Sequence, residues 1–170
     1  SLAAADAKGK VTRYLLAGGK PLAVYDHGAP VTGLAFSPNG KRFATGDGKV
    51  VKVWDTDKND TPVAVIADAG TPTGWVTDDR LAAGDGTAAG VHDLKAKEWA
   101  GRVTGVAGAW AVSPDGTKLA ATGTGLRVRI WDLTTGGQLH AENDTFPDPA
   151  LLHPTPGGKA VFILSGESAY

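Results

Sequence analysis

Four histidines are the residues of this 170-residue chain that could support acid–base or metal chemistry near neutral pH. His27 and His92 adjoin apolar, β-rich runs, whereas His140 and His153 lie in irregular stretches with no helical pairing between them. A zinc site needs three or four His, Cys or carboxylate ligands at short range. The chain has no cysteine, and its histidines show no such spacing. The sequence therefore predicts no metal site.

Several polar turns resemble functional motifs only superficially. The turn Asp57–Asp60 lacks the pattern and the distal glutamate of a calcium loop. The glycines at 46–48 and 84–86 open no predicted helix and lack Walker spacing, so they indicate turns rather than a phosphate site. Ser37 and Ser113 lie in Ser-Pro hairpins, not in a nucleophile elbow. We therefore expect no catalytic residues, no cofactor and no enzymatic activity.

Charge and hydropathy narrow the range of partners. The net charge is −1, with both signs scattered along the chain, so no field attracts nucleic acid or an anionic membrane. No apolar run approaches the ~20 residues that a membrane-spanning helix needs. The N-terminal residues lack the order of a signal peptide, and the chain contains no methionine, even at position 1. The sequence is therefore expected to be a piece of a longer protein.

The elements that would position these residues repeat along the chain. Residues 27–55 hold three apolar runs separated by the turn signals SPNGK and GDGK, and residues 103–132 repeat the same order of parts. Steps of 40, 38 and 39 residues separate the residues near the end of each third run, namely Tyr14, Trp54, His92 and Trp131. The runs alternate at period two, which predicts small antiparallel sheets rather than a helical solenoid.

Each complete unit holds four candidate strands. They are predicted at 31–36, 41–46, 50–54 and 62–67, at 73–77, 80–84, 88–92 and 98–102, and at 105–112, 117–122, 126–131 and 138–142. The unit boundaries are predicted at 27–67, 68–102 and 103–142, with partial units at 1–26 and 143–170. The front unit would lack its first strand, and the back unit would supply a first and a second strand and begin a third. Proline-rich residues 140–158 predict a long loop that leads into a weak or edge strand.

The hairpin sequences FSPNGK and VSPDGTK, the strand endings VKVWDT and VRIWDL, and the period near 39 are typical of one family. On these motifs the chain resembles the WD40 repeat family of β-propellers, in a bacterial-type form. The resemblance covers essentially the whole chain and is strongest at 27–62 and 103–138. It implies an all-β propeller with about four four-stranded blades per chain.

The resemblance also implies a structural hydrogen-bonded network in each blade, linking a histidine, a hydroxyl, the third-strand tryptophan and a turn aspartate. The positions that match it here are His27, Thr45, Trp54 and Asp47. The 103–138 unit keeps Trp131 but has Val103 and Ala121 in place of the histidine and the hydroxyl. The unit at 70–98 has His92 in place of the tryptophan. Only one complete network is therefore expected.

The fold resemblance favours a non-catalytic scaffold that binds a protein or peptide. The positions considered for a partner surface are Trp75, Trp110, His140 and Phe146, although core packing is an alternative for the two tryptophans. A propeller enzyme or ligand-binding module with its site at the channel mouth stays open as an alternative. So does a regulatory tail of a larger bacterial protein, such as a kinase.

Four repeat lengths are too few for a ring of the size usual in this family. Either the missing blades belong to a parent chain, or two copies associate head to tail into an eight-bladed ring. In the second case, strands from 2–27 of one copy would complete those from 149–170 of the other. A closed four-bladed monomer is the third option.

Overall fold

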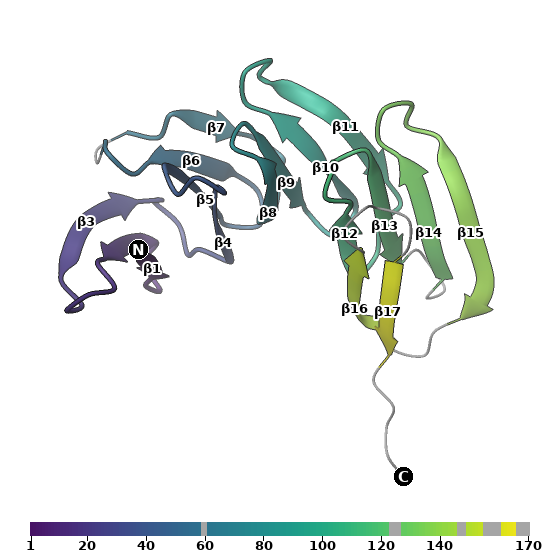
Figure 1. The fold of residues 1–170 in the computed structure, drawn as a ribbon, viewed down its shortest axis with the longest axis horizontal. Coiled ribbons are helices and arrows are strands. Elements are labelled where there is room, and N and C mark those ends of the chain that lie inside the picture. The colour runs from purple at the N-terminus through teal and green to yellow at the C-terminus, as the bar shows by residue number, and fades with distance from the viewer. Residues whose placement is uncertain (59–60, 123–126, 146–148, 155–160, 166–170) are drawn as a thin grey trace, which may run out of the picture. The chain divides into compact units, whose positions relative to one another are not determined.

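The computed structural model describes residues 1–58, 61–122, 127–145, 149–154 and 161–165, with side chains excluded at 127 and from 140 onward. The described residues form β-strands throughout, and Figure 1 shows them as successive antiparallel sheets. This confirms the predicted all-β fold. Within the described part of the chain, no helix has the length and apolar character to cross a membrane.

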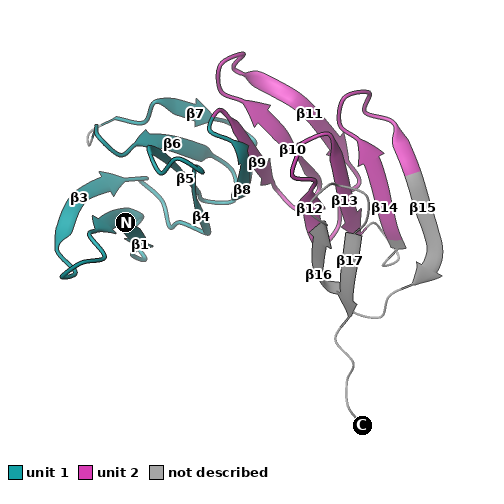
Figure 2. Cartoon of the chain, viewed as in Figure 1, with its two compact units in different colours: residues 1–78 teal, residues 79–170 magenta. Residues whose placement is uncertain are grey.

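The chain divides into two compact units, residues 1–78 and 79–170 (Figure 2). Unit 1 contains two sheets and one further strand. The first sheet has the order β1 (Leu2–Ala5), β2 (Lys10–Tyr14) and β3 (Pro21–Asp26). The second sheet has the order β4 (Gly33–Phe36), β5 (Arg42–Gly46), β6 (Val51–Asp55) and β7 (Ala64–Ile66), and it is followed by β8 (Thr71–Thr77).

Unit 2 continues the same pattern. The third sheet, which begins with β8, continues through β9 (Arg80–Gly84), β10 (Ala88–Asp93) and β11 (Glu98–Thr104). The fourth sheet has the order β12 (Trp110–Val112), β13 (Lys118–Thr122), β14 (Arg127–Asp132) and β15 (Gln138–Thr145). The last two strands, β16 (Pro149–Pro154) and β17 (Val161–Ser165), pair with each other.

The Ser-Pro turns form because a serine side chain supplies hydrogen bonds that the turn would otherwise lose. In the β4–β5 hairpin, the Ser37 hydroxyl donates to Asn39 Oδ1 at 2.9 Å and accepts from the Arg42 backbone N–H at 3.0 Å. Gly40 follows at a φ of 68°, a left-handed conformation that glycine adopts without steric penalty. The Ser-Pro sequence thus closes the hairpin and sets the register of β4 with β5.

The core of unit 1 lies between the first two sheets. It is an aromatic cluster in which Tyr25 from the first sheet meets Phe43 at 4.7 Å and Trp54 at 5.6 Å between ring centroids, both edge to face. Val11 completes the cluster, and all four side chains are at most 1% exposed. One face of the first sheet therefore covers one face of the second.

Equivalent positions in the two sheets follow from their register. Leu2 pairs with Tyr14 in the first sheet as Phe43 pairs with Trp54 in the second. Successive side chains of a strand point to opposite faces. We call the face that carries Phe43 and Trp54 in the second sheet, and their equivalents Leu2 and Tyr14 in the first, the back face. The opposite face, which in the first sheet carries Val11 and Tyr25, is the front face.

Glycines set the closest approaches in unit 2. A Cβ at Gly101 would lie 2.1 Å from the carbonyl oxygen of Leu133, and a Cβ at Gly90 would lie 2.1 Å from that of Gly101. No side chain fits at either position without a shift of the backbone. At Gly101 the third and fourth sheets meet backbone to backbone.

Two sequence predictions about strands were wrong. The predicted strand 105–112 is only Trp110–Val112, because Gly105 and Gly108 adopt left-handed φ angles of 78° and 84° and hold this stretch in turns. The predicted loop at 140–158 begins too early, because β15 continues to Thr145. β16 lies where the sequence predicted the first strand of the back unit. Pro149 and Pro154 stand at the two ends of β16, where a missing N–H is tolerated. The third strand expected to begin at 167 lies outside the described residues.

Candidate functional site

The histidine of the expected network is buried at the start of the second sheet. His27 Nδ1 lies 2.8 Å from Thr45 Oγ1, and the Trp54 indole Nε1 donates to the same oxygen at 2.9 Å. The three residues are 3%, 0% and 1% exposed. Because the indole can only donate, the Thr45 oxygen accepts from it and is free to donate its own hydrogen to His27 Nδ1. We assign His27 the tautomer that carries its hydrogen on Nε2.

Asp47 completes this arrangement at longer range. Its Oδ2 lies 3.7 Å from His27 Nε2, an ion-pair distance rather than a hydrogen bond. The backbone N–H groups of Val50 and Lys49 donate to Asp47 Oδ1 at 2.7 and 2.8 Å, and these bonds lower the pKa of Asp47. The structure thus brings His27, Thr45, Trp54 and Asp47 together around the start of the second sheet.

The electrostatics of His27 suit a structural role. Burial lowers its pKa, against the opposing effect of the Asp47 carboxylate, so the imidazole is favoured in its neutral form. The ammonium group of Lys52 donates to the His27 carbonyl at 2.8 Å and also lowers the histidine pKa. The His27 side chain is only 1% exposed, so no substrate can reach it as this structure stands.

The fourth sheet carries the same tryptophan without the network. Trp131 occupies the position of Trp54 and is 6% exposed. Ala121 stands where the second sheet has Thr45, so the hydroxyl acceptor is missing. Within the described part of unit 2, the Trp131 indole N–H has no hydrogen-bond acceptor.

The third sheet replaces the tryptophan with His92. Its imidazole meets the Trp99 ring edge to face at 5.4 Å, and the Arg102 guanidinium lies 4.7 Å from the centre of the same ring. His92 Nδ1 is buried without a hydrogen-bond partner among the described residues, and burial lowers the His92 pKa. Arg102 is held in addition by Asp85, at 3.1 Å. These contacts describe a packed aromatic group rather than a reactive histidine.

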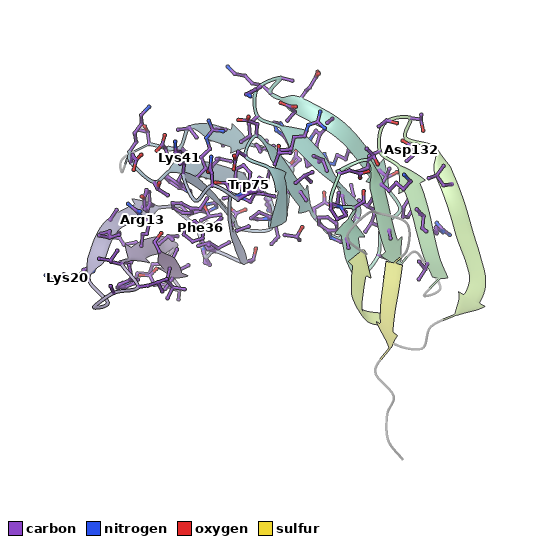
Figure 3. All side chains as sticks on the ribbon, viewed as in Figure 1. Arg13, Lys20, Phe36, Lys41, Trp75 and Asp132 are labelled. Atoms are coloured by element: carbon purple, nitrogen blue, oxygen red, sulfur yellow. The ribbon has the colours of Figure 1, made fainter. Side chains whose placement is uncertain are left out.

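The positions considered for a partner surface differ from one another. Trp75 on β8 is half-buried, and its indole N–H donates to the Ala35 carbonyl at 3.0 Å (Figure 3). Trp110 on β12 is also half-buried, but its indole N–H has no acceptor among the described residues. Its ring lies against Gly84, where an added Cβ would come within 2.9 Å of the Trp110 ring. The His140 side chain and Phe146 lie outside the described residues.

No metal-binding group emerges from the described residues, in which no three His, Cys, Asp or Glu side chains cluster suitably. The turn after β6 is held by Asp55, whose Oδ1 accepts from the Asp57 backbone N–H at 2.9 Å. Asn59 and Asp60 lie outside the described residues. Asp55 thus acts as a turn residue.

The exposed apolar side chains on the back face of the first sheet escaped the sequence analysis. Leu2 and Val24 are 56% and 53% exposed, although Phe43, the equivalent of Leu2 in the second sheet, is fully buried. Leu22, beside them at a bulge in β3, is 44% exposed. Thr12, Tyr14 and Val24 recur at alternate positions of two strands, but the same alternation places the pair Lys10 and Asp26 on this face.

Comparison with protein-family models places the repeats in a known family. The model for the WD domain, G-beta repeat, matches residues 19–55 and 91–132. Both matched stretches end on the Trp-Asp pairs of the second and fourth sheets. The chain carries WD40 repeats on a β-propeller fold.

A solved structure supports the propeller assignment of the WD40 chain independently. The chain is similar to the β-propeller domain of Cps50 (Swd1) from Myceliophteria thermophila, with a TM-score of 0.74 and 17% sequence identity. The match covers 96% of this chain and 58% of that one. At this identity the likeness shows the fold alone. A comparison with curated proteins found no match.

The WD40 assignment has a general functional meaning. WD40 propellers typically act as scaffolds for protein interactions and are generally not catalytic. Fold does not fix function, however, because sites are built on a fold by particular residues. The partner of this WD40 chain must therefore be argued from its surfaces.

Proposed function

We propose that this chain is a non-catalytic scaffold that binds a protein or peptide through the surface around Trp110. The observation that carries the proposal is the burial of His27, Thr45 and Trp54 in one hydrogen-bonded group. The histidine best placed for chemistry in the repeat is thereby committed to holding the second sheet. The groups that a partner can contact are therefore the exposed side chains at the ends of the sheets.

Trp110 is the best-supported contact residue on this framework. Tryptophan is enriched at the energetic centres of interfaces, because it combines a large apolar area with a hydrogen-bond donor. Trp110 is half-buried and keeps its indole N–H free of any described acceptor. Trp75 has the same residue type at an equivalent strand, but its N–H is already used by Ala35. The two tryptophans therefore form a matched pair for testing the proposal.

Peptide selection tests this function directly. Peptides selected from a random display library against the 170-residue chain would be measured for affinity by fluorescence anisotropy. We expect Trp110→Ala to weaken selected peptides about tenfold or more, which corresponds to ~1.4 kcal/mol, and Trp110→Phe to weaken them less. Val65→Ala, at an exposed side chain of β7, serves as the control and should leave the affinity unchanged.

Two outcomes would contradict the proposal. One is the absence of any selected peptide with specific binding. The other is binding that persists unchanged in Trp110→Ala, with far-UV circular dichroism showing that the variant is folded. Loss of binding in Trp75→Ala together with a loss of thermal stability would show that Trp75 acts through folding and not through contact.

A further inference from the structure

We propose that Asn39 is a site of spontaneous deamidation, and that the folded β4–β5 hairpin holds this reaction back through the Ser37 hydroxyl. The reaction replaces the side-chain amide of the asparagine by a carboxylate. Water is the co-reactant, and ammonia is released. The residues concerned are different from those around Trp110, so the inference goes beyond the proposed function and is tested separately.

The sequence and the exposure of the hairpin tip supply what deamidation needs. Of the three asparagines in the chain, Asn39 alone precedes a glycine. Asparagine is a thermolabile residue, and a following glycine has no side chain to shield its backbone nitrogen. The tip residues 38–41 are all exposed, so water reaches the amide.

The reaction has two steps. In the first, the Gly40 backbone nitrogen loses its proton to the solvent and attacks Cγ of Asn39. The bond from Cγ to the amide nitrogen breaks, the nitrogen leaves as ammonia after taking a proton from water, and a succinimide ring is formed. In the second step, water adds to one of the two ring carbonyls and the ring C–N bond breaks. The products are aspartate or isoaspartate, depending on which carbonyl is attacked.

The conformation of the folded turn keeps the attacking nitrogen away from Cγ. The Gly40 backbone N–H donates to the Ser37 carbonyl at 2.9 Å, and Asn39 has a negative φ. With Pro38 at its second position, this is a type I turn, in which the third residue, Asn39, has a ψ of about 0°. At that ψ the Cα–Cβ bond of Asn39 is turned roughly 120° from the C–N bond to Gly40, whereas the succinimide ring needs the two bonds nearly eclipsed.

Hydrogen bonds hold Asn39 in this unreactive position. Its Oδ1 accepts from the hydroxyl of Ser37, which is 4% exposed, and from the Lys41 backbone N–H, each at 2.9 Å. The Asn39 backbone N–H donates to Asp78 Oδ1 at 2.9 Å, which ties the tip to the turn after β8. Because Gly40 cannot attack while these bonds persist, the reaction has to wait until the tip opens.

The fourth sheet shows that the aspartate product fits the same turn. Asp115 is the equivalent of Asn39, and its Oδ1 accepts from the Ser113 hydroxyl at 2.6 Å and from the Thr117 backbone N–H at 3.0 Å. An aspartate at position 39 can therefore close the turn again with the same kinds of donor. Isoaspartate lengthens the backbone through its side chain, so it cannot restore the hairpin register.

Peptide mapping by mass spectrometry measures deamidation at Asn39 while the 170-residue chain is incubated in mildly alkaline buffer, with and without urea. We expect the folded chain to react at least about tenfold more slowly than the chain in urea, since the tip has to open first. Ser37→Ala should react about fivefold faster than the unmodified chain in buffer, the factor expected for one lost hydrogen bond, and equally fast in urea. Asp78→Ala, which frees the Asn39 N–H, should also accelerate the reaction, so the test does not depend on Ser37→Ala remaining folded.

Thr45→Val is the matched control, because it weakens the same sheet without touching the tip, and it should leave the rate in buffer unchanged. Equal rates in buffer and in urea would overturn the proposal, since the folded turn would then give no protection. A Ser37→Ala rate at or below that of the unmodified chain would overturn the role of Ser37. So would an equal acceleration in Thr45→Val, which would show that Asn39 reacts only when the whole sheet unfolds.

Discussion

The second and fourth sheets place a tryptophan at the same register position and surround it differently. In the second sheet, Trp54 donates to Thr45, and Thr45 in turn meets His27. In the fourth sheet, the equivalent of Thr45 is Ala121, and Trp131 has no described acceptor. Both tryptophans are nonetheless buried, at 1% and 6% exposure. Burial of the ring is therefore the common requirement, and the polar network is an addition that the second sheet has and the fourth lacks.

Truncation of the ring should give the largest effect. We expect Trp54→Ala to lower the free energy of unfolding by about 3–5 kcal/mol, because it opens a cavity in the aromatic core and leaves Thr45 without its donor. Trp131→Ala should cost less, since no hydrogen bond is lost. Urea unfolding followed by far-UV circular dichroism measures both variants. Equal losses of stability in the two variants would show that the hydrogen-bonded network contributes nothing beyond the burial of the ring.

Removal of the hydroxyl isolates the network from the ring. Thr45→Val keeps the shape of the side chain but leaves the buried Trp54 N–H unpaired, and we expect a loss of about 1–3 kcal/mol. Thr45→Ser retains the oxygen and should recover most of that loss. The same unfolding measurement applies. If Thr45→Ser is as unstable as Thr45→Val, packing of the methyl group is the cause, and the hydrogen bond is not.

The reverse substitution tests whether the fourth sheet can form the tryptophan–hydroxyl hydrogen bond that the second sheet has. Ala121→Thr offers Trp131 a hydroxyl at the position of Thr45, and we expect a gain of up to about 1 kcal/mol after the strain of the added atoms. The gain should vanish when Trp131→Phe is also present. A double-mutant cycle measures this coupling. A gain that survives in Trp131→Phe would have a source other than the indole N–H.

The smallest expected effect is the dependence on pH. Burial lowers the pKa values of both His27 and His92, so the unfolded chain binds protons more readily than the folded one near pH 6.5. The free energy of unfolding should therefore fall as pH drops from about 7.5 to 5. In the double variant with His27→Gln and His92→Gln, this slope should flatten.

Carboxylates change the free energy of unfolding at a lower pH than these histidines do. The Ser113 hydroxyl and the Thr117 backbone N–H hold the pKa of Asp115 at about 2, so its contribution is lost only below about pH 4. A slope between about pH 7.5 and 5 that is unchanged in the double histidine variant would contradict the assignment of neutral, buried histidines.

Much of the fold was predictable because local chemistry sets the hairpins. The Ser-Pro turns, the period-two runs and the Trp-Asp endings placed the strands of the second and fourth sheets within a few residues, apart from the shortened β12. The four residues His27, Thr45, Trp54 and Asp47 also lie together as the family resemblance implied. What was not predictable depends on contacts distant in sequence. Nothing local shows that the Trp75 indole has an acceptor in Ala35, 40 residues away.

The exposure of the first sheet escaped prediction for a related reason. Leu2 and Phe43 are both apolar residues in second strands, and the sequence cannot tell which of them has a sheet laid over it. The end of β15 was missed because proline-rich composition suggested a loop. The prolines of β16 in fact stand at its ends, where they cost no ladder hydrogen bond.

The contact between Gly101 and Leu133 has a consequence for how unit 2 comes apart. Chains of stacked repeats are often described as a row of elements that unfold one by one, each coupled only to its neighbours. At Gly101 the contact between the two sheets is made by backbone atoms. No flexible side chain lies between the sheets that could adjust while one of them unfolds. The third and fourth sheets should therefore exchange their amide hydrogens together, as one cooperative block, rather than fray in sequence.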